Sequence, residues 1–309
     1  MQIRFVSYAS NGVEQAGYCL NPADLMPGAD TEIISLDAFF ASQGLPASTS
    51  LTDAIAAFPD LAERLLAAGA DPAGTRVRAS DVHLLAPIPR PKKNVFCVGR
   101  NYKAHVKEAS EARAKEAKIP EHPQYFSKPP TTVVGPVDDV PLHEGLTEAL
   151  DYEVELGIII GKRGVNIPRE QVFDHIFGYT VINDVTARDL QKRHDRWFKG
   201  KGLDGSCPMG PWIVPAGDIP DPDALEVRLS VNGEIRQNAS VGEMIFDIRE
   251  LVSVLSQGIT LEPGDIIATG TPSGVGFAMK PPRLLADGDV MELEIPNVGR
   301  IRNTVRAGM

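Results

Sequence analysis

Two glutamates stand one residue apart at the start of a short apolar segment. Glu153 and Glu155 belong to Asp151-Tyr-Glu-Val-Glu-Leu-Gly157, which continues through three isoleucines to Gly161. An apolar run of this length that ends at a glycine is typical of a buried strand. Because side chains alternate along a strand, both carboxylates project from one face, about 6–7 Å apart. They repel each other unless a cation lies between them, whereas on an edge strand they would form a solvated acidic face.

A third acid, Asp184, follows the apolar segment from residue 179 to 182, which we interpret as another strand. Thr186 and Asp189 have the spacing of a capping box that opens a helix. Asp184 then lies at the carboxyl end of a strand, where active-site groups gather, although turn chemistry alone is an alternative. Three carboxylates form an all-oxygen site that suits Mg²⁺ or Mn²⁺, with Ca²⁺ as an in vitro substitute, better than Zn²⁺.

Composition narrows the class of protein. The 309 residues are enough for one large domain and a small one. The net charge of −10 argues against a nucleic-acid partner, and no apolar run approaches the ~20 residues of a membrane helix. The chain has three cysteines without Cys-x-x-Cys spacing and starts without a signal segment. We therefore expect reduced thiols, a cytoplasmic location and no membrane partner.

The pattern predicts an α+β protein that is predominantly β, with a small N-terminal α/β module at residues 1–75 and a catalytic domain at residues 76–309. In the module, Asn11-Gly12 separates strands at 3–8 and 14–20, and helices are expected at 36–43 and 51–68. In the larger part, Asn232-Gly233 marks a second hairpin, and Asp247 begins a helix that ends before Gly258. These short strands predict a mixed β-sandwich or rolled sheet.

Two further groups have the chemistry of a catalytic site. His105 and Glu108 lie three apart at the start of a helix-prone segment that extends to residue 118, so the carboxylate can orient the imidazole as a base. An exposed helical pair is the alternative. Lys201, or its competitor Lys199, lies in a glycine-spaced loop that can approach a ligand. The polar segment 110–122 predicts either a lid over the substrate or a surface helix.

Four blocks in this order resemble the fumarylacetoacetate hydrolase family. They are Val98-Gly-Arg-Asn-Tyr-Lys-Ala-His-Val-Lys-Glu108, Asp151-Tyr-Glu-Val-Glu-Leu-Gly157, Asn183-Asp-Val-Thr-Ala-Arg-Asp189 and Gly264-Asp-Ile-Ile-Ala-Thr-Gly-Thr-Pro-Ser-Gly-Val-Gly276. The resemblance implies the family's β-roll fold and a homodimer. It also implies the roles of the site residues. The catalytic residues would be His105, Glu108 and Lys201; the metal ligands Glu153, Glu155 and Asp184; and the substrate contacts Arg100, Tyr102, Lys128, Gln191 and Thr271.

The same resemblance, closest to the acylpyruvate and fumarylpyruvate hydrolase branch, implies a hydrolase that cleaves a C–C bond in a 2,4-dioxo acid and releases a 2-oxo acid such as pyruvate. His105 would activate water, and Lys201 would place a positive charge near the developing enolate. The loop 270–276 is interpreted as a tight loop that holds a carboxylate through its amides and the Thr271 hydroxyl. Oxaloacetate decarboxylation and isomerisation or decarboxylation of a 2-hydroxy-dienedioate stay open, as does a carboxylate-binding protein without turnover.

Overall fold

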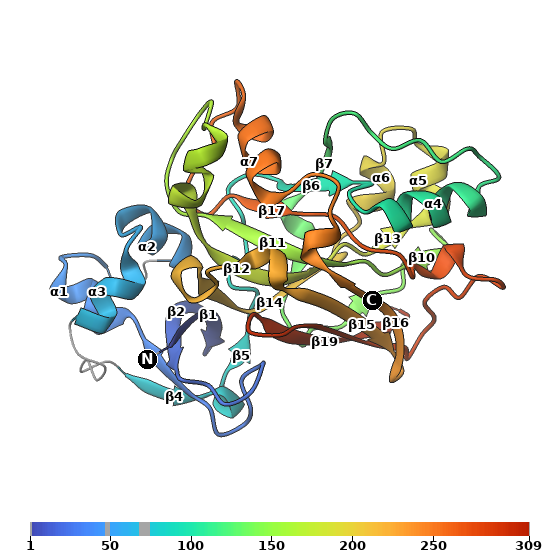
Figure 1. Cartoon of the computed structure of the whole chain (residues 1–309). Helices are drawn as coiled ribbons and strands as arrows, with labels where there is room; N and C mark the ends of the chain where they lie inside the picture. Colours follow the sequence, from blue (N-terminus) through green and yellow to red (C-terminus); the bar gives the residue numbers. More distant parts are fainter. Residues whose placement is uncertain (1, 47–49, 68–74, 309) are drawn as a thin grey trace.

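The computed structural model describes residues 2–46, 50–67 and 75–308 (Figure 1). Within these residues one large sheet of twelve strands and a second sheet of five strands carry the fold. The path of the large sheet is β4 (Arg76–Arg78), β3 (Glu32–Ser35), β2 (Val13–Leu20), β1 (Ile3–Ser10), β14 (Cys207–Pro215), β12 (Ile176–Asn183), β11 (Val154–Ile160), β17 (Ile266–Ala268), β6 (Val95–Gly99) and β7 (Gln124–Lys128), with β5 (His83–Leu84) beside β1 and β8 (Val133–Val134) beside β14.

The second sheet is arranged in the order β16 (Glu234–Ser240), β15 (Glu226–Val231), β18 (Val290–Ile295), β19 (Gly299–Arg306) and β9 (Val140–Pro141), and a short pair consists of β10 (Leu150–Asp151) and β13 (Thr186–Ala187). The α-helices are α1 (Asp37–Ser42), α2 (Leu51–Ala57), α3 (Leu61–Ala67), α4 (Lys103–Ala112), α5 (Arg188–Arg193), α6 (Phe198–Lys201) and α7 (Ile248–Ser256). The 3-10 helices are η1 (Ala79–Asp81), η2 (Pro130–Thr132), η3 (Arg169–His175), η4 (Ala216–Asp218), η5 (Pro222–Ala224), η6 (Val241–Glu243) and η7 (Gly276–Ala278).

The centre of the large sheet is buried on both faces. Every residue of β11 and β12 is buried, because Ile158 joins the core shared with the second sheet and Ile159 joins the core shared with α1–α3. In the second sheet, β15 alternates buried and more exposed positions, as expected for a strand with one covered face. The predicted α+β, predominantly β class is confirmed. The two glutamates do not lie on an edge strand, since β11 pairs with both β12 and β17.

The N-terminal hairpin forms as predicted, with Ser10 opposite Val13 and both turn residues at positive φ. The single helix expected at 51–68 is wrong within the described residues. It is divided into α2 and α3 around Pro59, because the residue before a proline is forced out of the helical region and Phe58 has φ −137° and ψ 83°. The end of the predicted helix, at residue 68, lies outside the described residues.

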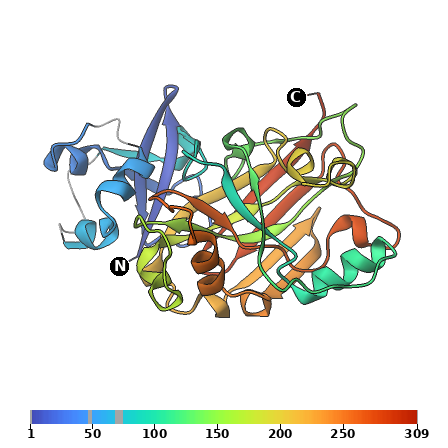
Figure 2. The same ribbon diagram turned by 90° about the horizontal axis from the view of Figure 1, so that it is seen from above.

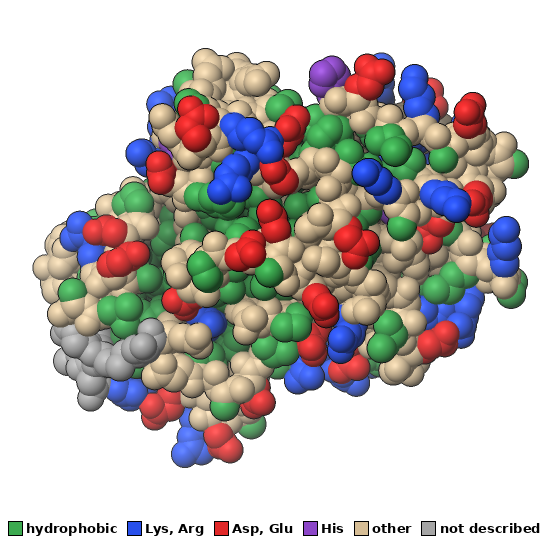
Figure 3. Space-filling view, viewed as in Figure 1, with side chains coloured by type: hydrophobic (Ala, Val, Ile, Leu, Met, Phe, Trp, Pro, Cys, Tyr) green, Lys and Arg blue, Asp and Glu red, His purple; other side chains and the backbone are tan. Residues whose placement is uncertain are grey.

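The N-terminal strands continue the large sheet, since β1 pairs with β14 at Phe5 and Ile213. Figure 2 shows α1–α3 at the opposite end of the molecule from α4. The proposed boundary between residues 75 and 76 stays a prediction. On the face in Figure 3, acidic and basic side chains are interspersed. None of the helices in the described part of the chain has the length and apolar character of a membrane span.

Two predicted caps have different outcomes. The Asp247 side chain accepts the Glu250 amide at 2.8 Å and begins α7 as expected, and the Glu250 carboxylate binds Arg169. The box at Thr186 and Asp189 is wrong. The Thr186 hydroxyl donates to the Asp184 carbonyl, and the Asp189 carboxylate accepts the Thr147 hydroxyl. α5 therefore begins at Arg188 without a side-chain cap.

Candidate active site

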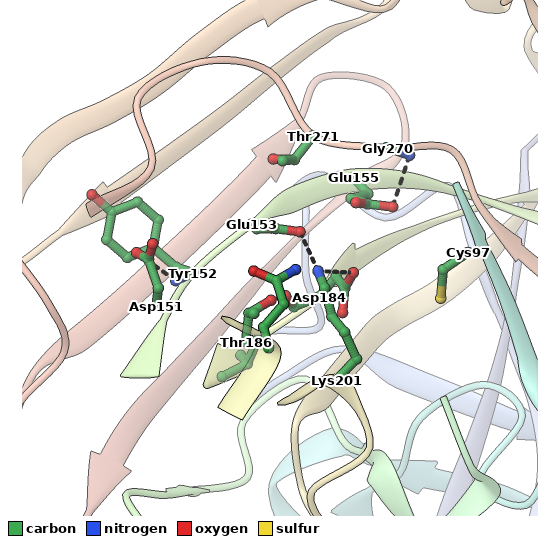
Figure 4. A network of polar contacts seen from close by, with 12 residues as sticks. Cys97, Asp151, Tyr152, Glu153, Glu155, Asp184, Thr186, Lys201, Gly270 and Thr271 are labelled. Carbon is green, nitrogen blue, oxygen red and sulfur yellow. Dashed lines mark hydrogen bonds and ion pairs between the residues drawn. The ribbon is translucent and has the colours of Figure 1, made fainter. Parts of the chain in front are cut away.

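The three acidic residues meet because β11 and β12 are antiparallel neighbours. Glu153 immediately precedes β11, Glu155 lies within it, and Asp184 immediately follows β12. The register places Val154 opposite Asn183, so the start of one strand lies beside the end of the other, and the Asp184 amide donates to the Glu153 carbonyl at 2.9 Å. Figure 4 shows the three side chains pointing toward one another from these strands.

The acidic cluster fits the divalent cation that the sequence predicts. One oxygen from each of the three carboxylates lies within 4.8 Å of the others, and all three residues are buried. Burial, together with the charges of Asp184 and Glu153, raises the pKa of Glu155 well above its usual range. A cation among these oxygens would offset that repulsion, and the all-oxygen donor set suits Mg²⁺, Mn²⁺ or Ca²⁺.

Lys201 balances part of this negative charge. Its Nζ lies 2.6 Å from Glu153 Oε2 and 2.5 Å from Asp184 Oδ2 (Figure 4). Although burial alone would raise it, the pKa of Glu153 is lowered, because Lys201 and Arg188 favour the carboxylate. Lys201 lies at the end of the short helix α6, which corrects the expectation of a loop, and the competing Lys199 is exposed.

Lys128 is placed differently from the predicted substrate contact. The residue is 0% exposed, and its Nζ lies 2.8 Å from Asp184 Oδ1. The same ammonium donates to the carbonyls of Val185 and Lys201. The ammonium therefore has two carbonyl acceptors and one ion-pair partner within the protein. Lys128 is not among the residues that line the cavity, so its position supports an ion pair with Asp184 and not the predicted substrate contact.

His105 and Glu108 form the predicted pair on α4. Nδ1 of the imidazole lies 2.9 Å from Glu108 Oε1, and the second carboxylate oxygen accepts the Gly274 amide at 2.9 Å. Glu108 is thus fixed from two sides and orients the ring. His105 lines the same cavity as Glu153 and Glu155. With Nδ1 engaged, Nε2 is the ring nitrogen left for exchange of a proton with a substrate.

The loop from Gly270 to Phe277 holds carboxylates through its amides, but they are the protein's own. Gly270 donates to Glu155 Oε2 at 2.8 Å, and the amide of Gly274 binds Glu108 as described above. The amides of residues 276 and 277 donate to the two oxygens of Asp151 at 2.8 and 3.1 Å. The φ of Gly270 is +100°, a conformation that favours glycine. The loop amides therefore hold carboxylates as predicted, and these carboxylates belong to the protein itself.

The sequence did not reveal the importance of Asp151 and Arg188. Arg188 Nε lies 2.9 Å from Asp151 Oδ2, and Nη1 lies 2.7 Å from Glu153 Oε1, with all three residues buried. The guanidinium therefore links the metal-ligand set to the loop at residues 276–277. Both residues stand inside the motif blocks that carry the family resemblance, which is the signal that could have found them.

A cavity of about 430 Å³, which includes space open to solvent, is lined by His105, Glu153, Glu155, Arg188 and Lys201. Of the predicted substrate contacts, Arg100, Gln191 and Thr271 line it. The Thr271 hydroxyl donates to the Val154 carbonyl and accepts from Gln237, so its proton is already used. Tyr102 is buried and lines a different pocket, together with Pro272. A direct contact between Tyr102 and the substrate is therefore not supported.

Comparison with known proteins agrees with this geometry. The fumarylacetoacetate hydrolase C-terminal family matches residues 94–306. Oxaloacetate tautomerase YisK of Bacillus subtilis is 52% identical over 226 residues, which are 73% of this chain and 74% of the relative. A fumarylacetoacetate hydrolase structure from Exiguobacterium antarcticum has a TM-score of 0.80 at 38% identity and covers 99% of both chains.

A probable 2-hydroxyhepta-2,4-diene-1,7-dioate isomerase from Mycobacterium abscessus has a TM-score of 0.77 at 33% identity, with both chains fully covered. These similar proteins are named as a tautomerase, a hydrolase and an isomerase, and family members are enzymes of these kinds. The family match covers more than half of the chain, including all three carboxylates and the His105–Glu108 pair. The chain therefore belongs to the fumarylacetoacetate hydrolase family.

Proposed function

We propose that this protein is a metal-dependent enzyme that interconverts the keto and enol forms of a short 2-oxo dicarboxylic acid, with oxaloacetate as the substrate. One observation carries the proposal. Two of the three clustered carboxylates, Glu153 and Glu155, line one cavity together with His105, which Glu108 orients. The other charged residues that line this cavity are the cations Arg100, Arg113, Arg188 and Lys201. Such a site has candidate ligands for a divalent cation, a general base, and positively charged residues that can bind an anionic substrate.

A divalent cation held by Glu153, Glu155 and Asp184 would supply a Lewis acid for the carboxylate and keto oxygens of a 2-oxo acid. His105, held through Nδ1 by Glu108, takes a proton from the carbon next to the keto group. The protonated imidazole then passes a proton to the former keto oxygen, so His105 is returned to its starting state, no water is consumed and no C–C bond breaks. Lys201 stabilises the negative charge that develops on the keto oxygen.

The name of one relative motivates the choice of tautomerisation among the reactions of the family. The Bacillus subtilis protein named oxaloacetate tautomerase is 52% identical, whereas the Exiguobacterium hydrolase structure is 38% identical. Tautomerisation also needs neither a positioned water nor cleavage of a C–C bond, because proton transfer and charge stabilisation suffice. The chemistry shared with the isomerase relative is proton transfer at a carbon beside a carbonyl.

The test is an ultraviolet assay of the decay of enol-oxaloacetate, with Mg²⁺ or Mn²⁺ and with a chelator. A positioned general base contributes about 10²–10⁴-fold, so His105→Gln should lower the rate by that order. Lys107→Gln is the matched control, because Lys107 is an exposed residue on the same helix. Decay that is unaffected by the chelator, or a His105→Gln rate equal to that of the control, would refute the proposal.

Hydrolysis of an acylpyruvate or fumarylpyruvate is the second candidate, because a fixed His–Glu pair is also the arrangement that activates water. Oxaloacetate decarboxylation needs no such base. We therefore propose one substrate panel with the wild-type protein and product identification. C–C cleavage faster than tautomerisation would make the hydrolase the function of this chain. Binding of these acids without turnover would favour the carboxylate-binding alternative.

A further inference from the structure

Arg113 stands at the end of α4, where the helix turns toward the cavity. The predicted helix through residue 118 is shorter in the structure, because Ala114 has φ +50° and the Lys115 amide returns to the Ser110 carbonyl. This is the hydrogen-bond pattern of a Schellman motif. Arg113 is the C-cap residue, is partly buried and lines the cavity.

The contacts of Arg113 place it beside Arg188, a second cation on the same wall of the cavity. Its Nη2 donates to Gln191 Oε1 at 3.3 Å, and the same oxygen accepts Arg188 Nη1 at 3.4 Å. The ring of Phe277 lies under both guanidinium groups, at 5.1 Å from that of Arg113 and 4.5 Å from that of Arg188. A neutral amide and an aromatic face thus hold two like charges side by side.

This wall carries positive charge that the protein does not fully neutralise. Across the described residues, no carboxylate lies within ion-pair distance of Arg113, and the buried Arg188 Nη2 has no hydrogen-bond partner. Burial and the positive charges of Arg188 and Arg100 lower the pKa of Arg113. An anion between the two guanidinium groups would relieve both the unpaired donor and the repulsion.

We propose that Arg113, with Arg188 beside it, binds the second carboxylate of a dicarboxylate substrate. Arg113 is then a specificity-determining residue. The inference rests on the proposed function and adds a residue that distinguishes a 2-oxo dicarboxylate from a 2-oxo monocarboxylate. The three polar contacts from Arg113 through Gln191 and Arg188 to Glu153 place this subsite on the same wall as the metal-ligand set. A four-carbon diacid is short enough to be held at both ends by groups this close.

Arg100 is the competing cation. It also lines the cavity, but it is exposed and its guanidinium lies 5.9 Å from the centre of the Trp197 ring. Solvent screens the charge of an exposed side chain, whereas the partly buried Arg113 acts through a medium of lower dielectric constant. The second carboxylate is therefore assigned to the Arg113 side of the cavity.

Binding of two unreactive acids of equal length tests this assignment. Malate and 2-hydroxybutyrate share the carboxylate and hydroxyl of one end, but only malate has a carboxylate at the other. Isothermal titration of the Mg²⁺-loaded protein with each acid would be compared for wild type, Arg113→Gln, Arg100→Gln and Lys107→Gln. Lys107→Gln removes the same charge from the exposed face of α4.

Wild type should bind malate more tightly than 2-hydroxybutyrate. A charge-assisted contact is worth about 10- to 100-fold in affinity, so Arg113→Gln should weaken malate binding by that factor and change 2-hydroxybutyrate binding by less than about 3-fold. Arg100→Gln and Lys107→Gln should retain the preference for malate. Equal weakening of both acids by Arg113→Gln, a larger loss in Arg100→Gln, or no preference in wild type would overturn the assignment. These binding measurements need no turnover, so they test the assignment of Arg113 even if the protein lacks tautomerase activity.

Discussion

Replacing Asp151 by Asn should destabilise the protein far more than the loss of one surface charge. Asp151 is 0% exposed and accepts four donors. Oδ1 takes the amides of Tyr152 and Gly276 at 3.0 and 2.8 Å, while Oδ2 takes Arg188 Nε and the Phe277 amide at 2.9 and 3.1 Å. An asparagine has the same shape, but its amide nitrogen would face two of these donors.

Each buried donor left without an acceptor costs about 1–3 kcal/mol, and breaking a buried ion pair costs about 3–5 kcal/mol. These effects overlap because they concern the same atoms, so we expect a loss of about 3–5 kcal/mol in the free energy of unfolding. Urea unfolding followed by tryptophan fluorescence measures it, since Trp212 is buried.

Asp139→Asn is the control, because Asp139 and Arg306 form an exposed pair at 3.4 Å worth less than about 1 kcal/mol. A loss for Asp151→Asn no larger than that of the control would show that the Asp151 network is not a significant source of stability.

The remaining predictions concern the metal, the thiols and the assembly. Glu155→Gln should abolish Mg²⁺ binding and metal-dependent activity but preserve the circular dichroism spectrum; unchanged Mg²⁺ affinity by calorimetry would contradict the assigned ligand set. Cys19, Cys97 and Cys207 are free and buried, and burial raises the pKa of Cys19 and of Cys207 to about 12. All three should therefore react with a thiol reagent only after denaturation, and rapid labelling of the native protein would refute this. Light scattering should give twice the 33.3 kDa chain mass at micromolar concentration, as expected for a homodimer, and a monomer mass would count against it.

Local chemistry made several features predictable. Asn11-Gly12 defines a two-residue turn because both positions accept positive φ, and Asp247 begins α7 because its short side chain reaches the Glu250 amide. The alternation of strand side chains placed Glu153 and Glu155 on one face. The break at Pro59 was also readable from the sequence, but the apolar spacing on both sides of it favoured one continuous helix.

Long-range packing decided the rest. Nothing near Lys128 in the sequence indicates that its ammonium is buried against Asp184, 56 positions away, instead of facing a ligand. Arg188 and Asp151 pair only because β10 and β13 lie side by side. Arg113 reaches the cavity because the chain leaves α4 at Ala114, which has positive φ although alanine strongly favours continuing a helix.

The sequence by itself determined the acidic cluster, the His105–Glu108 pair and the family, because these depend on residue type and short spacing. The tertiary structure alone decided which cations neutralise the protein's own carboxylates and which face the cavity. That division depends on burial and on contacts between segments far apart in the chain, and local spacing carries no information about either.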